Sequence, residues 1–260
     1  MNLTILGSGS SVPHSHRAAS AHWLGTGAGT ILLDASADAA HRAAEENLAW
    51  PELDAIWISH FHLDHIGGLP SLLFGVKYAT QTQKRRKPLT ITGPHGLRKL
   101  IEAFDAANHY KLLEQPFPVE IREVVSQEEF EILPGIRAQT LSTPHTSESL
   151  ALRLKDERGA SLVYSSDTGY TPALGEFARE VDLFLLECSF PLHKPVETHL
   201  ELREACALAR QAKALCTVLV HLYPDWDGVD FDSEMKKHSV GGSTMTLGFD
   251  GMKMDVEASN

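Results

Sequence analysis

The stretch His60-Phe61-His62-Leu63-Asp64-His65 is the most informative part of this sequence, because it places four metal-binding types of side chain close together. A short apolar run precedes it and indicates a buried strand. Side chains alternate along an extended segment, so His60 and His62 point to one side. Asp64 and His65 fall where a helix begins and turn toward a neighbouring point. The segment therefore predicts two metal positions, with zinc as the first choice and manganese or iron as alternatives.

Several other apolar runs also end at a residue that can bind metal. These strand-end residues are His145, Asp167, Glu187 and His221. In α/β sheets, binding sites form beyond the carboxyl ends of the strands, so we expect them to meet the first segment at one edge of the fold. The chain has 14 histidines, and those without this context are expected to be surface or core residues. They are His14, His16, His22, His41, His95, His109 and His238.

Composition limits the class of protein. With 260 residues, 43% of them hydrophobic, the chain can bury a substantial core, and we expect a single domain over residues 1–260. Cys188, Cys206 and Cys216 are odd in number and lack Cys-x-x-Cys spacing, which favours a reducing compartment and a cytoplasmic protein. The first residues enter a strand almost at once. We see no signal peptide and no apolar segment long enough to span a membrane.

Strands and helices alternate along the chain in two halves. Strands are expected at 2–6, 20–24, 30–34, 55–58 and 89–92, and helices near 36–47, 68–79, 94–107, 172–179 and 200–212. The glycine-rich segment Gly25–Gly29 joins two strands and carries no lysine for a nucleotide phosphate, so it predicts a hairpin turn. Region 108–130 is the least patterned and is the candidate for a flap. The order of elements fits two facing sheets with helices outside.

At this point the chain resembles the metallo-β-lactamase superfamily, and within it the phosphodiesterases similar to ribonuclease Z. The His-x-His-x-Asp-His motif is highly specific for the superfamily, and the opening strand and the Thr-His-Leu segment favour the phosphodiesterase group. The resemblance implies an α/β fold, the four-layer αββα sandwich. It rests on Leu3–Pro13, Ile31–Asp34, His60–His65 with Gly68-Leu69-Pro70, Leu89–Pro94, His145, Ser166-Asp167-Thr168, Leu186–Phe190, Thr198-His199-Leu200 and Val220-His221-Leu222.

The resemblance also implies a role for each candidate ligand. The implied ligands are His60, His62 and His145 for one metal ion, Asp64, His65 and His221 for a second, and Asp167 as the bridge between both. Two cations about 3.5–4 Å apart bind a hydroxide and clamp the oxygens of an in-line displacement. Asp64 would additionally accept a hydrogen bond from that hydroxide and orient it.

Glu187 and His199 match a Glu–His pair of the same group. There the histidine is thought to assist the phosphate or to protonate the leaving oxygen, while the carboxylate fixes the imidazole tautomer and raises its basicity. The alternative interpretation is a structural contact between a strand and a helix. We expect Asp64, His199 and Glu187 to be the catalytic residues.

The sequence departs from the tRNA-processing members at one place. Those proteins carry a long arm, rich in glycine and proline, between the positions that match His145 and Asp167. Here the intervening segment reads as a plain hairpin, with strands near 150–154 and 160–164. The formal net charge of −11 also disfavours nucleic acid, because phosphate neutralisation supports that affinity. The one basic cluster, Lys84–Lys87, is expected to be a solvated loop rather than a binding patch.

We therefore expect a metal-dependent hydrolase with two divalent ions that cleaves a small or cyclic phosphodiester. One alternative is a tRNA 3′-end endonuclease with RNA as its partner, and another is a lactone or thioester hydrolase. A metal-binding module without turnover is the alternative from a different class. Complete ligand sets together with the Glu187–His199 pair argue against it, since a structural site closes its coordination. The resemblance also suggests a homodimer.

Overall fold

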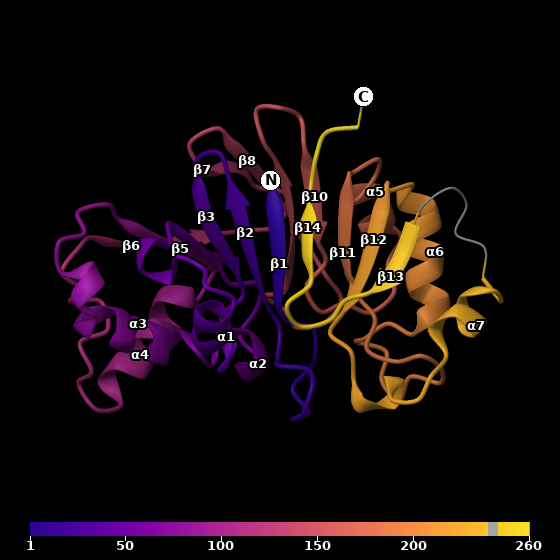
Figure 1. The fold of residues 1–260 in the computed structure, drawn as a ribbon, viewed down its shortest axis with the longest axis horizontal. Coiled ribbons are helices and arrows are strands. Elements are labelled where there is room, and N and C mark those ends of the chain that lie inside the picture. The colour runs from indigo at the N-terminus through magenta and orange to yellow at the C-terminus, as the bar shows by residue number, and fades with distance from the viewer. Residues whose placement is uncertain (239–243, 260) are drawn as a thin grey trace.

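The computed structural model describes residues 1–238 and 244–259. Its strands form two seven-stranded sheets, ordered β14-β1-β2-β3-β4-β5-β6 and β13-β12-β11-β10-β9-β8-β7 (Figure 1). The strands of the first sheet are β1 Asn2–Gly7, β2 Ala21–Thr26, β3 Gly29–Leu33, β4 Ala55–Trp57, β5 Leu89–Pro94, β6 Val119–Val124 and β14 Lys253–Asp255. Those of the second are β7 Glu129–Leu133, β8 Ile136–Ser142, β9 Leu150–Lys155, β10 Ser161–Tyr164, β11 Leu183–Glu187, β12 Cys216–Val220 and β13 Thr244–Leu247.

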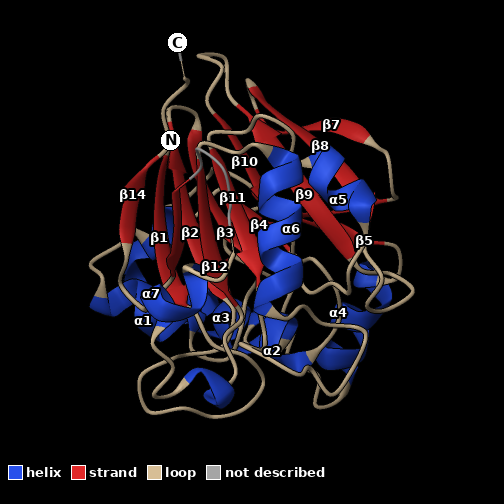
Figure 2. Cartoon of the chain, turned by 90° about the vertical axis from the view of Figure 1, so that its right-hand side faces the viewer, coloured by secondary structure: helices blue, strands red, loops and turns tan. Residues whose placement is uncertain are grey.

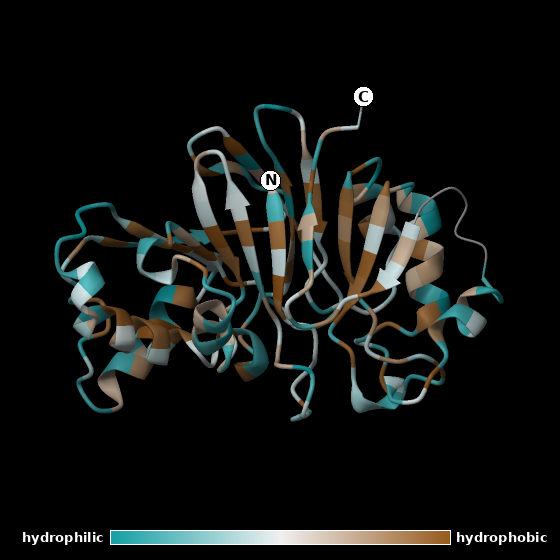
Figure 3. Ribbon diagram, in the orientation of Figure 1, coloured by the Kyte–Doolittle hydropathy of each residue, from teal (hydrophilic) through white to brown (hydrophobic). Residues whose placement is uncertain are grey.

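The two sheets face each other across an apolar core. Ile31 and Trp57 from the first sheet join Leu152 and Leu185 from the second in one buried cluster. Because apolar side chains exclude water from both inner faces, this contact is the main force that holds the sheets together. Hydrophobic residues accordingly gather on the strands, while many loops are hydrophilic (Figure 3).

Helices cover both outer faces. Helices α1 Ala39–Glu45, α2 Leu63–Ile66, α3 Leu69–Tyr78 and α4 Leu97–Ala106 belong to the first sheet, and α5 Pro172–Phe177 and α6 Leu202–Ala212 pack on the second (Figure 2). A short helix, α7, spans Phe231–Met235, and single 3-10 turns lie at Trp50–Glu52, Thr80–Thr82 and Pro224–Trp226. The layers therefore follow the order helix, sheet, sheet, helix, which confirms the predicted αββα sandwich.

The five predicted helices form, although most are a few residues shorter than expected. The first begins at Ala39 rather than at 36, because Asp34 adopts a positive φ of 60° and the Ser36 hydroxyl donates to the Ala19 carbonyl at 2.9 Å. The last begins at Leu202, where Glu201 and Glu204 form a capping box. At α6 the boundary is set by these side-chain hydrogen bonds, which periodicity does not register.

Region 108–130, the candidate for a flap, does not line the cleft described below. Val119–Val124 forms β6, which pairs parallel with β5 at the edge of the first sheet. Leu112 and Phe117 in the preceding connection are buried in the cluster between that sheet and its helices. The segment therefore serves the core.

Two predicted hairpins are confirmed. Strands β2 and β3 pair antiparallel around the Gly25–Gly29 segment, and β9 and β10 pair antiparallel without an inserted arm. Among the described residues, no helix is both long and apolar enough to cross a membrane.

Parallel strands prepare the site. Strands β3 to β6 run parallel in the first sheet, and β10 to β13 run parallel in the second. Their carboxyl ends open toward the lower edge of the molecule in Figure 1. The loops that leave these strands carry the predicted ligands to that shared edge.

Candidate metal centre

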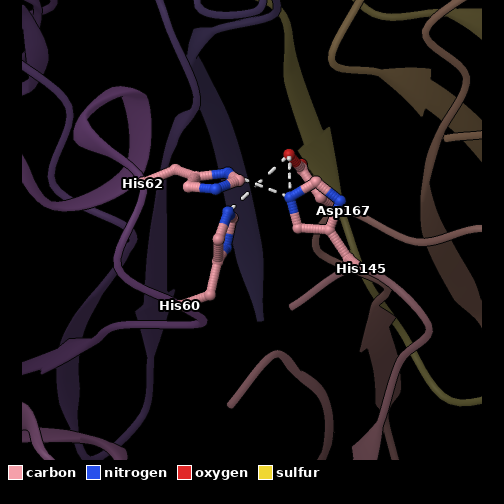
Figure 4. Close-up of side chains that lie close together, drawn as sticks. All are labelled: His60, His62, His145 and Asp167. Carbon is pink, nitrogen blue, oxygen red and sulfur yellow. Dashed lines mark hydrogen bonds and ion pairs between the residues drawn. The ribbon is translucent and has the colours of Figure 1, made fainter. Parts of the chain in front are cut away.

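The first group of ligand-type side chains consists of His60, His62, His145 and Asp167. Each offers a ligand atom, and these atoms lie within 4.8 Å of one another. His145 Nε2 is 3.0 Å from His62 Nδ1 and 3.5 Å from Asp167 Oδ2, and His60 Nε2 is 3.8 Å from the same oxygen. The four side chains point toward one another (Figure 4). They offer three nitrogens and one oxygen to a common point.

A second group, Asp64, His65, Asp167 and His221, lies beside the first and shares Asp167 with it. The Nε2 atom of His65 is 3.2 Å from Asp167 Oδ1, and that of His221 is 3.3 Å from Asp167 Oδ2. His221 Nε2 is also 3.3 Å from Asp64 Oδ2. Both carboxylate oxygens of Asp167 therefore face histidine nitrogens, as a bridging ligand requires.

The buried atoms at the centre fit a pair of metal ions. His60 Nε2, His65 Nε2 and Asp167 Oδ1 are fully buried and make no hydrogen bond within the part of the chain that the structure describes. Buried polar atoms without partners are rare and costly, because they lose water and gain nothing in exchange. Imidazole nitrogens and carboxylate oxygens together suit zinc and similar divalent ions.

Outer hydrogen bonds hold the histidine rings in place. His65 Nδ1 donates to Asp34 Oδ2 at 2.7 Å, and His145 Nδ1 donates to the Thr198 carbonyl at 3.0 Å. His221 Nδ1 lies 3.0 Å from Ser189 Oγ. A partner on Nδ1 fixes the tautomer and leaves the Nε2 lone pair for a cation. The arrangement thus prepares the inner nitrogens as ligands.

Asp34 is a functional residue that we did not single out by its chemistry. Its Oδ2 atom accepts hydrogen bonds from Tyr164 Oη at 2.6 Å and from Ser59 Oγ at 2.8 Å, in addition to the one from His65. Burial and the neighbouring Asp34 raise the pKa of Tyr164 well above its usual range, so the hydroxyl remains a donor. The available signal was that Asp34 also follows a strand, as the predicted ligands do.

Burial and neighbouring charges shift the pKa values of the residues at the centre in opposite directions. Burial lowers the pKa of His60 well below its usual range, which keeps that ring neutral. Burial also disfavours a charged His65, but Asp167 and Asp34 outweigh it and raise its pKa well above 6.5. Burial disfavours ionised Asp64 as well, yet the hydrogen bond from His221 and the charges of His65 and His221 together outweigh it and lower the pKa of Asp64 to about 2. Asp64 is therefore ionised at neutral pH, and a metal ion would compete with the proton on His65.

Glu187 and His199 meet as the sequence predicted. His199 Nδ1 lies 2.6 Å from Glu187 Oε1, and the side chains of both residues are buried. Glu187 also accepts hydrogen bonds from the backbone N–H groups of Thr168, Ser189 and Leu200, so its oxygens are already used. Burial lowers the pKa of His199, but the hydrogen bond and charge of Glu187, together with the charges of Asp167 and Asp64, outweigh burial and raise this pKa above its ordinary value. Glu187 therefore suits orienting His199 better than binding metal.

Both groups open into one cleft of about 1090 Å³. His62, Asp64, Asp167, His199 and His221 lie at its base. The walls come from the loop after β1, from helix α1 and from the residues that follow β12. Ligand sites commonly have volumes of about 300–1,000 Å³, so this cleft has room for a nucleotide-sized molecule.

The histidines that were expected to be ordinary surface or core residues fall into three groups by location. His14, His16 and His41 line the cleft. Their position was not predictable from the pattern of strand ends, because none of these residues follows one. His22 is fully buried, and its surroundings lower its pKa to about 3, mainly through burial. The others stay outside the cleft. The basic cluster also stays outside it, and Arg85 is buried while it donates to the carbonyls of Pro51, Lys87 and Pro88.

Comparison with known proteins gives a consistent relationship. Ribonuclease Z of Mycobacterium bovis (strain BCG / Pasteur 1173P2) is 26% identical over 246 residues, covering 86% of each chain. The metallo-β-lactamase fold protein YhfI of Bacillus subtilis superimposes with a TM-score of 0.79 at 20% identity, over 97% of this chain and 98% of that one. A diphosphatase from the PhnP family gives 0.76 at 23% identity, over 98% of each chain.

These relationships confirm the resemblance inferred from the motifs, and the solved structures share the fold. The protein is thus a hydrolase of the metallo-β-lactamase fold, which is a class of enzymes that depend on metal ions. Residues 1–239 match the family described as "Anti-Pycsar protein Apyc1". Because that match spans most of the sequence, the chain belongs to the anti-Pycsar protein Apyc1 family.

Proposed function

We propose that this hydrolase uses two metal ions, with zinc as the first choice, to cleave a small or cyclic phosphodiester. The observation that carries the proposal is the pair of ligand groups that share Asp167 beside the buried Glu187–His199 pair. Two ions held by these groups would activate water and stabilise the oxygens of a displacement at phosphorus. A structural metal site would need neither the second group nor an acid–base partner.

Each ligand has a proposed place. His60, His62 and His145 would hold one ion, and Asp64, His65 and His221 the other, with Asp167 between them. Asp64 also lines the cleft, and its low pKa keeps a free carboxylate oxygen there to accept a hydrogen bond from the attacking water.

His199 is the proposed proton donor. Its Nδ1 atom is held by Glu187, so Nε2 is the nitrogen left for the substrate. The residue lines the cleft together with His221, and their rings stack at 5.2 Å. A raised pKa favours a protonated ring, which can donate to a phosphate oxygen or to the departing oxygen.

The short connection between His145 and Asp167 and the net charge of the chain support a small substrate. The chain between His145 and Asp167 contains the β9–β10 hairpin, whose strands pair directly and leave no arm to grip a folded RNA. Negative formal charge adds to this preference, because RNA affinity depends on neutralised phosphates. A cyclic nucleotide or a cyclic ribose phosphate fits both observations.

The proposal is tested by turnover of the zinc-loaded and manganese-loaded protein on three substrates in parallel. We expect cleavage of bis(p-nitrophenyl) phosphate and of a 3′,5′-cyclic nucleotide, and no comparable rate on a lactone. Preference for the lactone would replace the phosphodiester with a carbonyl substrate. Loss of turnover after metal removal, with recovery on adding metal back, is the control.

A tRNA 3′-end endonuclease is the second candidate, because a relative that is 26% identical to this chain is named ribonuclease Z. We predict slow or no cleavage of a precursor tRNA, since the short β9–β10 hairpin lies where the tRNA-processing enzymes carry their arm. Position-accurate release of a 3′ trailer at physiological salt would promote this candidate. The expected homodimer and the cytoplasmic location stay predictions, and sedimentation of the purified protein checks the first.

A further inference from the structure

Three sulfur atoms meet on the outer side of the second sheet, away from the cleft. Cys206 lies on the buried face of α6, Met235 ends α7, and Met245 belongs to β13. The Sγ atom of Cys206 is 3.8 Å from Met235 Sδ and 3.9 Å from Met245 Sδ. In Figure 1 these three elements lie together at the right. We call Cys206, Met235 and Met245 the sulfur cluster, and none of the three lines the cleft.

Sulfur is concentrated in this cluster. The whole chain has five methionines and three cysteines, and here one cysteine faces two of the methionines. The Cys206 thiol carries a single proton, so it can donate to only one of the two thioethers. The other contact brings two sulfurs together without a hydrogen bond. Packing requires methionines to fill space, but it does not require both Sδ atoms to turn toward one thiol.

The spacing of the sulfurs fits a shared metal ion. Metal–thiolate bonds are about 2.3 Å long, so sulfurs around one ion at tetrahedral or trigonal angles lie about 3.8–4.0 Å apart. Both measured distances fall in this range. Cys206 is fully buried, whereas Met235 and Met245 are half-buried. An ion would therefore reach the thiol past the two methionines.

The donor set favours one class of ion. Thiolate and thioether sulfurs are soft donors that suit copper(I), whereas magnesium and manganese prefer oxygen. Zinc sites take four thiolate, imidazole or carboxylate ligands. Among the described residues, Cys206 belongs to no group of three or more such side chains. The sulfur cluster therefore suits a soft monovalent cation better than it suits zinc.

The Cys206 thiol is a poor candidate for covalent chemistry. Burial raises its pKa to about 11, although the charge of Arg210 acts in the opposite direction. The sulfur is therefore protonated at neutral pH and weakly nucleophilic. Copper(I) would replace the thiol proton, which passes to the solvent, and no electron is transferred. Cation binding needs no oxidant and no second cysteine.

We propose that the sulfur cluster binds one copper(I) ion per chain, at a site separate from the candidate metal centre. The bound ion would fasten α7 and β13 to α6, where Met235 and Met245 now contribute only partly buried apolar contacts. Because none of the three side chains lines the cleft, the ion would stabilise the fold without changing the site of hydrolysis. The inference does not depend on the proposed phosphodiesterase function.

The test is competition for copper(I) between the zinc-loaded protein and the coloured chelator bathocuproine disulfonate, without oxygen. We expect the wild type to withdraw one copper(I) per chain. Met235→Leu and Met245→Leu should each weaken the affinity at least about tenfold, and the double variant should weaken it further. Leucine keeps the volume, so the melting temperature without copper should change little. Met254→Leu and Cys216→Ala are the matched controls, because both residues pack against the core between the sheets.

X-ray absorption at the copper edge identifies the ligands directly. We expect only sulfur neighbours, at about 2.3 Å. Copper(I) should also raise the melting temperature of the wild type and not that of the double variant. Nitrogen or oxygen neighbours would place the ion elsewhere and overturn the inference. No withdrawal by the wild type, or equal withdrawal by the wild type and the double variant, would show that the three side chains only pack together.

Discussion

At the scale of single residues, Asp167 is the point where the two ligand groups join, since its oxygens face His65 on one side and His145 and His221 on the other. We predict that Asp167→Ala lowers the metal content from about two ions per chain to well under one. His62→Ala should lose less, because it belongs to one group. Elemental analysis of the dialysed proteins measures this. Unchanged metal in the Asp167 variant would remove the bridging assignment.

His199 is predicted to behave differently from the ligands. His199→Ala should keep both metal ions and the melting temperature but lose about 10²–10⁴ in rate, the usual size of an acid–base contribution. The loss should be smaller for p-nitrophenyl esters, because that leaving group needs little protonation. Kinetics on esters with graded leaving-group pKa, beside metal analysis, provide the measurement. A variant without metal would make His199 a ligand, and one with normal rates on a poor leaving group would make it structural.

The candidate metal ligands were predictable from sequence where they follow the end of a predicted strand. The His60–His65 segment and the strand-end residues His145, Asp167 and His221 all meet at the predicted edge. Tyr164 and Ser59, which bond to Asp34, were not predictable, because their contacts join segments far apart in the chain and their residue types are common in cores.

At the scale of elements, Asp182 joins three segments of the second half. Its side chain accepts hydrogen bonds from Ser161 N and Oγ at 2.8 Å and from Ser259 N and Oγ at 2.8 Å, which tie the start of β10 and the chain after β14 to the start of β11. We predict that Asp182→Ala lowers the free energy of unfolding by about 1–3 kcal/mol, because it leaves buried donors without acceptors. Urea unfolding measures the change.

The same carboxylate gives a pH dependence of defined sign. Burial raises the pKa of Asp182, but hydrogen bonds from Ser161 and Ser259 outweigh it, and the pKa is lowered from 3.8. Stability from this group is therefore full above the unfolded pKa and is lost as pH falls through the lower folded value. Asp182→Asn should be less stable than wild type at pH 7, and the gap should shrink below about pH 4. A gap that is equal at pH 7 and pH 3 would contradict this assignment.

Elements themselves were predictable where one pattern dominated. Apolar runs and helical periodicity marked five strands of the first half and the five longer helices, because burial on one face sets both periods. Region 108–130 was not predictable, since β6 alternates weakly at a sheet edge and Leu112 and Phe117 reach the core from irregular backbone. Edge strands carry a weaker pattern because one side of the ladder faces solvent.

At the scale of the whole molecule, the candidate ligands come from both sheets. His60, His62, Asp64 and His65 follow β4, whereas His145, Asp167 and His221 follow β8, β10 and β12. We infer that residues 1–260 form one domain, because a single core takes side chains from both sheets. Bound metal ions would then fasten the sheets at the edge below that core.

We therefore predict that metal removal destabilises the entire fold. Metal that binds only the native state contributes about 4 kcal/mol at a thousandfold excess over its Kd. For a chain of this size, that corresponds to a fall in melting temperature on the order of 10 °C. Calorimetry with and without a chelator measures the shift, and Asp167→Ala should be far less sensitive to the chelator. Identical melting of the metal-loaded and metal-free wild type would show that the sheets do not depend on the ions.

The place of β14 beside β1 has a consequence for how the enzyme is made. One of the two strands that pair with β1 is β14, and Asp250 ties both ends of the loop after β1, beside the site. The chain must therefore be synthesised through Asp255 before β1 can pair on both sides. Until then β1 remains an open edge, the kind of surface that invites wrong pairing. An interrupted translation product would carry the entire His60–His65 segment and still lack the Asp250 side chain that holds one wall of the cleft. We expect such incomplete chains to have little activity and to be readily proteolysed.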